Sequence, residues 1–412
     1  MMKRKRFPWF TVGMLFMATA LSFLDRQVLS ILAPSILANF GITNTTYSHI
    51  VFAFQLSYTV MAAFGGYMID RLGVKLGLTL SLGIWSAASA AHAFVRNGAQ
   101  LAIARFALGF GEGACFPAAT RGAVEYSAPE DRSFATGIAI GGSALGAVLT
   151  PPLTVLLAVR YGWRGAFLIS GLLGILWCAV WIIFVKPAPR STHSSTASSY
   201  SELLKQPGLL WFLLARFVFD PVFYFYMFWI PQFLSKERGL PLQTIGNLFW
   251  IPFLMLSVSQ IFSGRLTDVL SKTMGSVTAK RRMLLIAAAM TPVSWCAGLV
   301  GSIPAAIGCM SLLLFAHGIW ITNYLSLVTD LLPAENNASI VGLTGMVGGI
   351  SGMISTLIIG PTVDRFSFAP VFAVSGVVYP CAYVCVTLAI RSADRAKSLS
   401  LTGVPIHADQ SS

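Results

Sequence analysis

Long apolar runs, separated by short polar breaks, fill almost the whole chain. A helix that crosses a membrane needs about 20 apolar residues, and runs this long without period-two alternation do not fit barrel strands. Only 10% of the 412 residues are charged, against about 25% in soluble domains. The sequence therefore predicts an all-α integral membrane protein with twelve transmembrane helices. The runs lie at residues 9–34, 47–69, 76–95, 99–124, 134–158, 165–186, 207–234, 241–263, 283–301, 304–329, 338–362 and 369–390.

The positive charge of the chain indicates a topology. The net charge is +13, and placing the N-terminus in the cytoplasm puts most lysines and arginines on that side, as the positive-inside rule requires. No aromatic or groove-reading residues cluster with these charges, so we expect no nucleic-acid partner. The basic start could belong to a secretory signal, but the run after it is too long, and we expect an uncleaved first helix. We expect a multi-pass plasma-membrane protein, in a bacterial inner membrane, with both termini cytoplasmic.

A polar connector divides the chain into two similar halves. Residues 188–201 are rich in Pro, Ser, Thr and Ala, a composition typical of a flexible linker. The segment Gly66–Lys75 after the second run is echoed by Gly264–Asp268 after the eighth, and such internal repeats are common in secondary carriers. We expect two pseudo-symmetric six-helix bundles. Their expected bounds are 1–187 and 207–392, with a cytoplasmic linker at 188–206 and a cytoplasmic tail at 393–412.

Charged residues that lie inside apolar runs of the first half include Asp25, Arg26, Arg105 and Glu112. A charge at the bilayer centre costs at least about 2.5 kcal/mol, so it is rarely there without a task or a partner. Arginines facing a protein-lined cavity predict an anionic ligand, and carboxylates beside them predict a proton or cation. Arg26 could instead form an internal ion pair with Asp25 or Glu112, and Asp25 could pair structurally with Arg105.

Other chemistry finds little support in the sequence. Gly109, Gly111 and Gly113 form a G-x-G-x-G run, but it follows no strand and opens no helix, so it does not indicate a dinucleotide site. No G-x-x-x-x-G-K-[ST] motif occurs. The histidines are scattered and the cysteines lie in apolar runs without metal-ligand neighbours, which disfavours a membrane-embedded enzyme or sensor. We expect no catalytic residues, no metal and no cofactor.

The loop after the second run, G-x-x-x-D-R-x-G-x-K, resembles the signature of the major facilitator superfamily. The twelve-run, two-half layout agrees with this resemblance, which covers essentially the whole chain. A tight glycine turn carrying an Asp–Arg pair suits a conformational latch. The resemblance implies that the latch residues are Gly66, Asp70, Arg71, Gly73 and Asp268.

Within that superfamily the chain resembles the anion:cation symporters, which include hexuronate, galactonate and phthalate carriers. The segment Phe23-Leu24-Asp25-Arg26 looks like the family's aromatic-x-Asp-Arg element, and the run from Arg105 to Glu112 looks like its Arg/Glu helix. By this resemblance Arg26 anchors the substrate carboxylate, and Glu112 and Asp25 carry the coupled proton. Arg105 is then a residue that takes part in the coupling or orients the other site residues.

The resemblance also implies further binding residues. Tyr58 matches a substrate-contacting tyrosine of galactonate-type carriers, whereas Ser143 stands where those carriers have a glutamine, a departure that weakens a claim for galactonate. Polar positions in the second half add His317, Asn323 and Gln260 as candidate substrate ligands. Arg216 and Asp220, four residues apart, form a possible buried pair or a clamp near the cytoplasmic end of their helix.

These observations predict proton-coupled uptake of a small organic anion, a sugar acid such as glucuronate or galacturonate, by alternating access. Its partners would be the anion, the proton and the lipid bilayer, and we expect a monomer. Another carboxylate, such as an aldonate, tartrate or an aromatic acid, is the first alternative. A drug or metabolite exporter is the second, although the two intramembrane arginines and a fifth run without a Gly-Pro step disfavour it.

Overall fold

The computed structural model describes residues 7–187, 200–332 and 337–401, and its regular elements there are all helices. The basic segment 3–6, most of the expected linker and the end of the expected tail lie outside the described residues. The first half contains α1 (Trp9–Phe40), α2 (Asn44–Leu72), α3 (Val74–Ala91), η1 (His92–Phe94), α4 (Gly98–Glu112), α5 (Cys115–Tyr126), η2 (Pro129–Asp131) and α6 (Arg132–Phe184). The second half contains α7 (Tyr200–Leu204), α8 (Leu209–Phe228), α9 (Ile230–Lys236), α10 (Leu242–Leu248), α11 (Trp250–Met274), α12 (Ser276–Met290), α13 (Val293–Leu299), α14 (Ile303–Leu331), α15 (Asn337–Phe366) and α16 (Ala369–Leu401).

Ten helical segments of the described chain are long and apolar enough to cross a membrane. Two features explain the difference from the twelve runs of the sequence. Helix α6 contains two of the runs and turns back near Gly162, whose φ of 71° is a left-handed conformation that favours glycine. The fourth run is broken at Gly113 into α4 and α5, each too short to be counted alone. The architecture is therefore the expected twelve-span helical fold.

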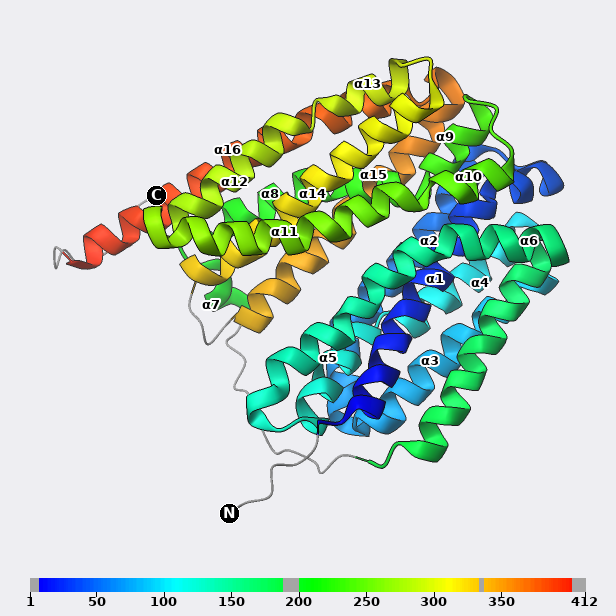
Figure 1. Ribbon diagram of the computed structural model, residues 1–412, viewed down its shortest axis with the longest axis horizontal. Helices are drawn as coiled ribbons and strands as arrows, with labels where there is room; N and C mark the ends of the chain where they lie inside the picture. The colour runs from blue at the N-terminus through cyan, green and yellow to red at the C-terminus, as the bar shows by residue number, and fades with distance from the viewer. Residues whose placement is uncertain (1–6, 188–199, 333–336, 402–412) are drawn as a thin grey trace, which may run out of the picture.

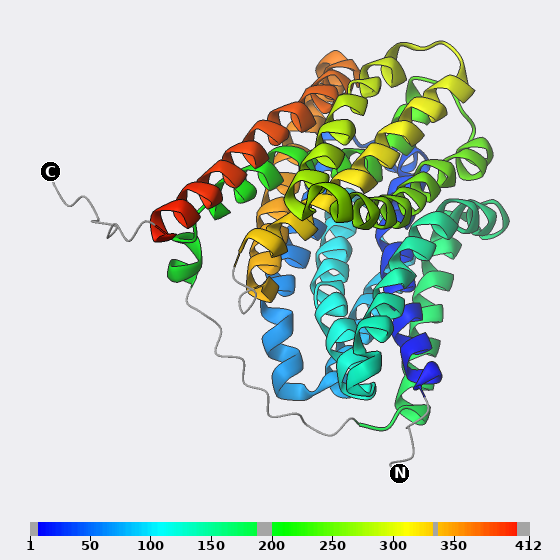
Figure 2. The same ribbon diagram turned by 60° about the vertical axis from the view of Figure 1, so that its left-hand side comes forward.

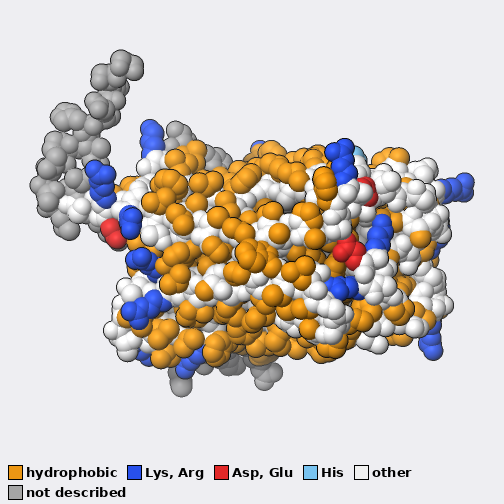
Figure 3. Space-filling view, turned by 90° about the horizontal axis from the view of Figure 1, so that it is seen from above, with side chains coloured by type: hydrophobic (Ala, Val, Ile, Leu, Met, Phe, Trp, Pro, Cys, Tyr) orange, Lys and Arg blue, Asp and Glu red, His pale blue; other side chains and the backbone are white. Residues whose placement is uncertain are grey.

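The surface of the molecule fits a bilayer. Figure 3 shows a broad hydrophobic zone across the middle of the visible face, with lysines and arginines gathered toward its two ends. Large apolar side chains such as Ile103, Ile183 and Ile261 are 70%, 71% and 78% exposed. Such exposure would be costly in water and is favourable against lipid tails.

The two halves form two bundles that lie against one another (Figures 1 and 2). The first turn of α1 and the last turn of α16 lie on one face, which we call the terminal face. The opposite face, where α1 ends at Phe40 and α2 begins at Asn44, we call the distal face.

Hydrogen bonds join the halves near the distal face. The Asp364 carboxylate at the end of α15 accepts bonds from the backbone and side chains of Asn44 and Thr45 at the start of α2. Tyr47 donates its hydroxyl to the Phe228 carbonyl at 2.8 Å. The distal face is therefore sealed by contacts between the halves.

Candidate functional site

Glycines on α4 allow it to pack directly against its neighbours. A Cβ at Gly109 would collide with the carbonyl of Phe54 on α2, and one at Gly111 would lie 2.6 Å from the backbone nitrogen of Trp85 on α3. One at Gly113 would lie 2.7 Å from the Tyr58 carbonyl. This close packing holds α4, with its two charged residues, between α2 and α3.

Arg26 on α1 and Glu112 on α4 form a buried ion pair. One oxygen of Glu112, Oε1, accepts from Arg26 Nε at 2.8 Å, from Arg26 Nη2, and from Ser22 Oγ at 2.8 Å. The Tyr58 ring centroid lies 4.4 Å from the Arg26 guanidinium, and Phe23 and Phe54 also face it. Arg26 and Tyr58 are thus brought together as expected, and the arginine is held by a carboxylate of the protein.

The second Glu112 oxygen, Oε2, has no hydrogen-bond partner among the described residues, although it is buried. The described residues thus bond to only one of the two carboxylate oxygens of Glu112, and the other lies unpaired in the interior of the protein.

Asp25 and Arg105 do not pair through their side chains. Asp25 Oδ1 accepts from Ser89 Oγ at 2.8 Å, and Ser89 is bonded in turn to Ser170. Arg105 donates to the carbonyl of Arg26 at 2.9 Å and, more weakly, to that of Asp25 at 3.4 Å. Arg105 thus bonds to the backbone of α1 and not to the Asp25 side chain. It supports the turn of α1 that carries Asp25 and Arg26.

The second half has its own pair, Arg216 and Asp220 on α8. Arg216 Nε donates to Asp220 Oδ2 at 2.6 Å, and the two side chains are 16% and 6% exposed. The backbone of α15 comes so close at Gly348 that a Cβ there would collide with Asp220 Oδ2. Of the two expected placements, the structure has the buried pair in the middle of the protein, because both residues line a cavity between the halves.

That cavity has a volume of about 220 Å³. Its wall from the first half comes from α1 and α6, and its wall from the second half comes from α8, α11 and α14. The predicted ligands Ser143, Gln260 and His317 all reach it. Its polar lining consists of Ser143, Arg216, Asp220, Tyr224, Ser257, Gln260 and His317.

Two predicted ligands are already engaged by protein partners. His317 Nδ1 bonds to the Tyr379 hydroxyl at 2.5 Å. Asn323 accepts from Thr267 at 2.7 Å, and its amide donates to the Ile319 carbonyl at 2.8 Å. Asn323 does not line the cavity, and its bonds hold α11 against α14.

The sequence did not indicate several residues that the structure places at the site. Ser22 bonds to Glu112, Ser89 bonds to Asp25, and Tyr224 lines the cavity. Small hydroxyl residues are common in membrane helices and carry no signal of their own. Ser22 could have been found, because it lies one helical turn before Arg26 and so shares its face.

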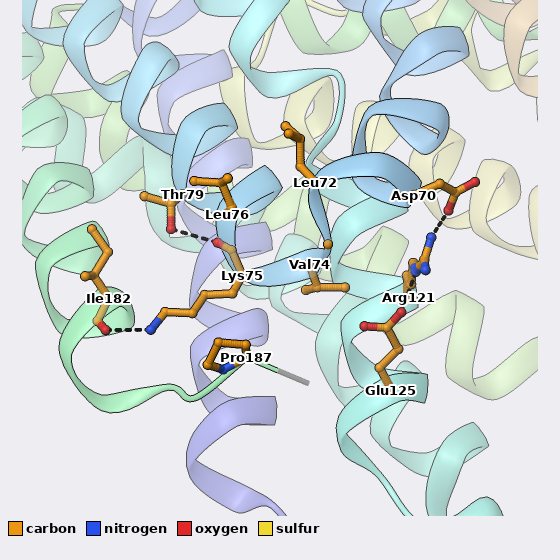
Figure 4. A pocket seen from close by; sticks show the side chains of 11 residues that line it. Asp70, Leu72, Val74, Lys75, Leu76, Thr79, Arg121, Glu125, Ile182 and Pro187 are labelled. Atoms are coloured by element: carbon orange, nitrogen blue, oxygen red, sulfur yellow. Dashed lines mark hydrogen bonds and ion pairs between the residues drawn. The ribbon is translucent and has the colours of Figure 1, made fainter. Parts of the chain in front are cut away.

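The glycine-turn segment forms a second cavity, of about 390 Å³, at the terminal face (Figure 4). Asp70 at the end of α2 pairs with Arg121 on α5, and Arg121 Nε also donates to Glu125 at 2.6 Å. Lys75 donates to the Ile182 carbonyl at 2.8 Å. The segment therefore ties α2, α3, α5 and α6 together within the first half.

The individual latch residues differ in what they do. Gly73 has a φ of 78°, which requires glycine in the turn, whereas a Cβ at Gly66 would meet nothing. Arg71 lies over the Tyr67 ring, with 4.6 Å between the guanidinium carbon and the ring centroid. Asp70 pairs with Arg121 and not with Arg71. Asp268, the counterpart in the second half, is exposed.

Comparison with known proteins identifies the family of the chain. The family model of the Major Facilitator Superfamily matches residues 15–356. The chain is 29% identical to a hexuronate transporter of Escherichia coli K12, over 92% of each protein. It is also 29% identical to a galacturonate transporter of Dickeya chrysanthemi, over 66% of this chain and 85% of that protein. Its fold is similar to a bacterial homologue of the human lysosomal transporter Spinster, solved inward-facing and unoccupied, with a TM-score of 0.75, 17% identity, and coverage of 97% of this chain and 98% of that one.

Proposed function

The chain belongs to the Major Facilitator Superfamily, and we propose that it is a proton-coupled symporter that imports a small organic anion, a sugar acid such as glucuronate or galacturonate. It is a membrane transporter and not an enzyme. We infer that it works as a monomer in the plasma membrane, with two six-helix bundles that move relative to one another.

The observation that carries the proposal is the buried bond between Arg26 and Glu112. A substrate carboxylate that binds Nε and Nη2 of Arg26 takes the place that Glu112 occupies. A buried carboxylate that has lost its arginine partner raises the free energy of the protein as long as it stays charged. Glu112 therefore takes up a proton as the anion binds, which links the two movements. Asp25, whose side chain has no arginine partner among the described residues, is the second candidate for the coupled proton.

The chemical class of the substrate rests on the relatives and on the cavity. Proteins named for hexuronate and galacturonate transport match this chain over most of its length. The cavity offers hydroxyl, amide and imidazole groups beside the ion pair of Arg216 and Asp220. This lining suits a polyhydroxylated anion better than an apolar one.

The conformation supports alternating access. The distal face is sealed by bonds such as those of Asp364, and the positive-inside rule assigns the terminal face to the cytoplasm. We infer that the structure is the inward-facing state. The Asp70–Arg121 pair then lies at the cytoplasmic ends of the helices, where a latch acts.

Uptake into proteoliposomes tests the function. Radiolabelled glucuronate and galacturonate should accumulate when an inward proton gradient is imposed, and added nucleotide should have no effect. Flux that follows a sodium gradient and ignores pH would assign the coupling to sodium. Flux of tartrate or an aromatic acid with none of the sugar acids would move the substrate to another carboxylate class.

A further inference from the structure

The seam between α2 of the first half and α15 of the second has a defined register. A Cβ at Gly360 would lie 2.6 Å from Ser48 Oγ, and one at Gly349 would lie 2.7 Å from Thr59 Oγ1. Ser48 precedes Thr59 along α2, whereas Gly360 follows Gly349 along α15, so the helices are antiparallel. Residues 55 of α2 and 353 of α15 consequently lie at the same level.

Gln55 and Thr356 face each other across this seam. Gln55 lies seven residues after Ser48 and four before Thr59, and the same spacings place Thr356 on the face of Gly349 and Gly360. Side chains lean toward the N-terminus of their own helix, so Gln55 leans toward the distal face and Thr356 leans away from it. The two polar groups therefore converge.

Both side chains are buried and neither is used by the protein. Gln55 is 3% and Thr356 is 1% exposed. Both amide atoms of Gln55 and the Thr356 hydroxyl have no hydrogen-bond partner in the part of the chain that the structure describes. In contrast, the Ser48 hydroxyl in the same seam donates to the Thr45 carbonyl at 2.7 Å. Unpaired buried polar groups are disfavoured in a permanent interface, so these groups indicate a ligand that forms bonds there during part of the cycle.

The position of these groups connects them to the anion site. Gln55 lies three residues before Tyr58, whose ring faces the Arg26 guanidinium, and one residue after Phe54, whose carbonyl meets α4 at Gly109. On the other helix, a Cβ at Gly352 would collide with the ring of Tyr224, which lines the central cavity. An anion held at Arg26 would thus extend toward this seam.

We propose that Gln55 and Thr356 recognise the ring hydroxyls of a sugar acid whose carboxylate is bound by Arg26. The inference rests on the proposed function. An amide and a hydroxyl each offer a donor and an acceptor, and together they match adjacent hydroxyl groups that do the same. Because the two residues come from different halves, both bind the sugar together only when the distal side closes over it. Recognition of the hydroxyls would therefore favour closure.

Equilibrium binding to the full-length carrier, measured by thermal stabilisation, tests the proposal with two probes. Glucuronate carries the hydroxyls, and oxane-2-carboxylate keeps the ring and the carboxylate without them. In Gln55→Leu and Thr356→Val we expect glucuronate affinity to fall by about tenfold to a hundredfold, and affinity for oxane-2-carboxylate to change little. Replacing an unpaired buried polar group by an apolar one should leave the unliganded protein as stable or more stable.

Gln232→Leu is the matched control, because Gln232 on α9 is also a fully buried glutamine with an unpaired amide. We expect it to leave the ratio of the two affinities unchanged. Equal losses of affinity for both probes in Gln55→Leu, or no loss for either probe, would overturn the hydroxyl-binding role while the transport function stands. A wild-type carrier that binds neither probe would overturn both.

Discussion

Among the described residues, each half of the protein buries one arginine–carboxylate pair, and the two pairs are built differently. Arg26 and Glu112 join two helices, α1 and α4, whereas Arg216 and Asp220 lie four residues apart on α8. Three aromatic rings surround Arg26, and its side chain is only 7% exposed. The Arg216 side chain is 16% exposed and lines the cavity.

The difference indicates a division of roles. A ligand that separates Arg26 from Glu112 breaks a bond between two helices, so it can change how they pack as well as where a proton resides. A ligand that separates Arg216 from Asp220 breaks a bond within one helix. The backbone hydrogen bonds of that helix keep its conformation without the pair. We therefore expect the first pair to couple anion and proton and the second to tune the charge of the cavity.

The largest expected effect comes from replacing arginine by lysine in each pair. Arg26→Lys keeps the charge but loses the planar fork that can hold a carboxylate through two bonds. We expect kcat/KM for glucuronate to fall about a hundredfold, and that of Arg216→Lys to fall about tenfold or less. Initial uptake rates in proteoliposomes measure both.

The order of the two losses is the informative result. Near-normal anion affinity in Arg26→Lys would remove its role as the carboxylate anchor. A larger loss in Arg216→Lys than in Arg26→Lys would reverse the comparison and place the anion in the second half.

Glu112→Gln should separate exchange from accumulation. Glutamine resembles the protonated acid in shape and charge, so the variant should still bind the anion and exchange it across the membrane. It cannot release a proton, so an inward proton gradient should no longer drive accumulation. Counterflow and proton-driven uptake are measured on the same proteoliposomes.

Asp25→Asn is the comparison variant for that experiment, since Asp25 bonds to Ser89 and not to an arginine side chain. Loss of both activities in Glu112→Gln would make Glu112 structural or a direct substrate ligand. Retention of both, with accumulation lost in Asp25→Asn, would transfer the coupled proton to Asp25.

The next effect in size is that of Asp220→Asn. The amide keeps a hydrogen-bonding group beside Arg216 but leaves the positive charge uncompensated until an anion arrives. We expect the unliganded protein to lose thermal stability, the stabilisation by glucuronate to increase, and the apparent KM to fall about threefold to tenfold. Proton-driven accumulation should persist, and its loss would show that the second pair also couples.

The sequence predicted the helical fold and the residues of both pairs, because buried charges are rare enough to stand out in apolar helices. It left open whether Arg26 pairs with Asp25 or Glu112, since that depends on how α4 packs against its neighbours through its glycines. The Arg121 partner of Asp70 could not be predicted either, because the two residues belong to helices far apart in the sequence.

The smallest expected effect tests how the second pair is supported by α15. Gly348→Ala would push a methyl group into Asp220 Oδ2 and within 2.9 Å of Arg216 Nε, so the pair must shift. We expect an increase in KM of about threefold, with proton-driven accumulation retained. Gly345→Ala, one turn earlier where a Cβ meets nothing, is the control and should behave as the wild type. If Gly348→Ala abolished accumulation as Glu112→Gln is expected to do, a small displacement of the second pair would be enough to uncouple the carrier, and the two halves would share the coupling.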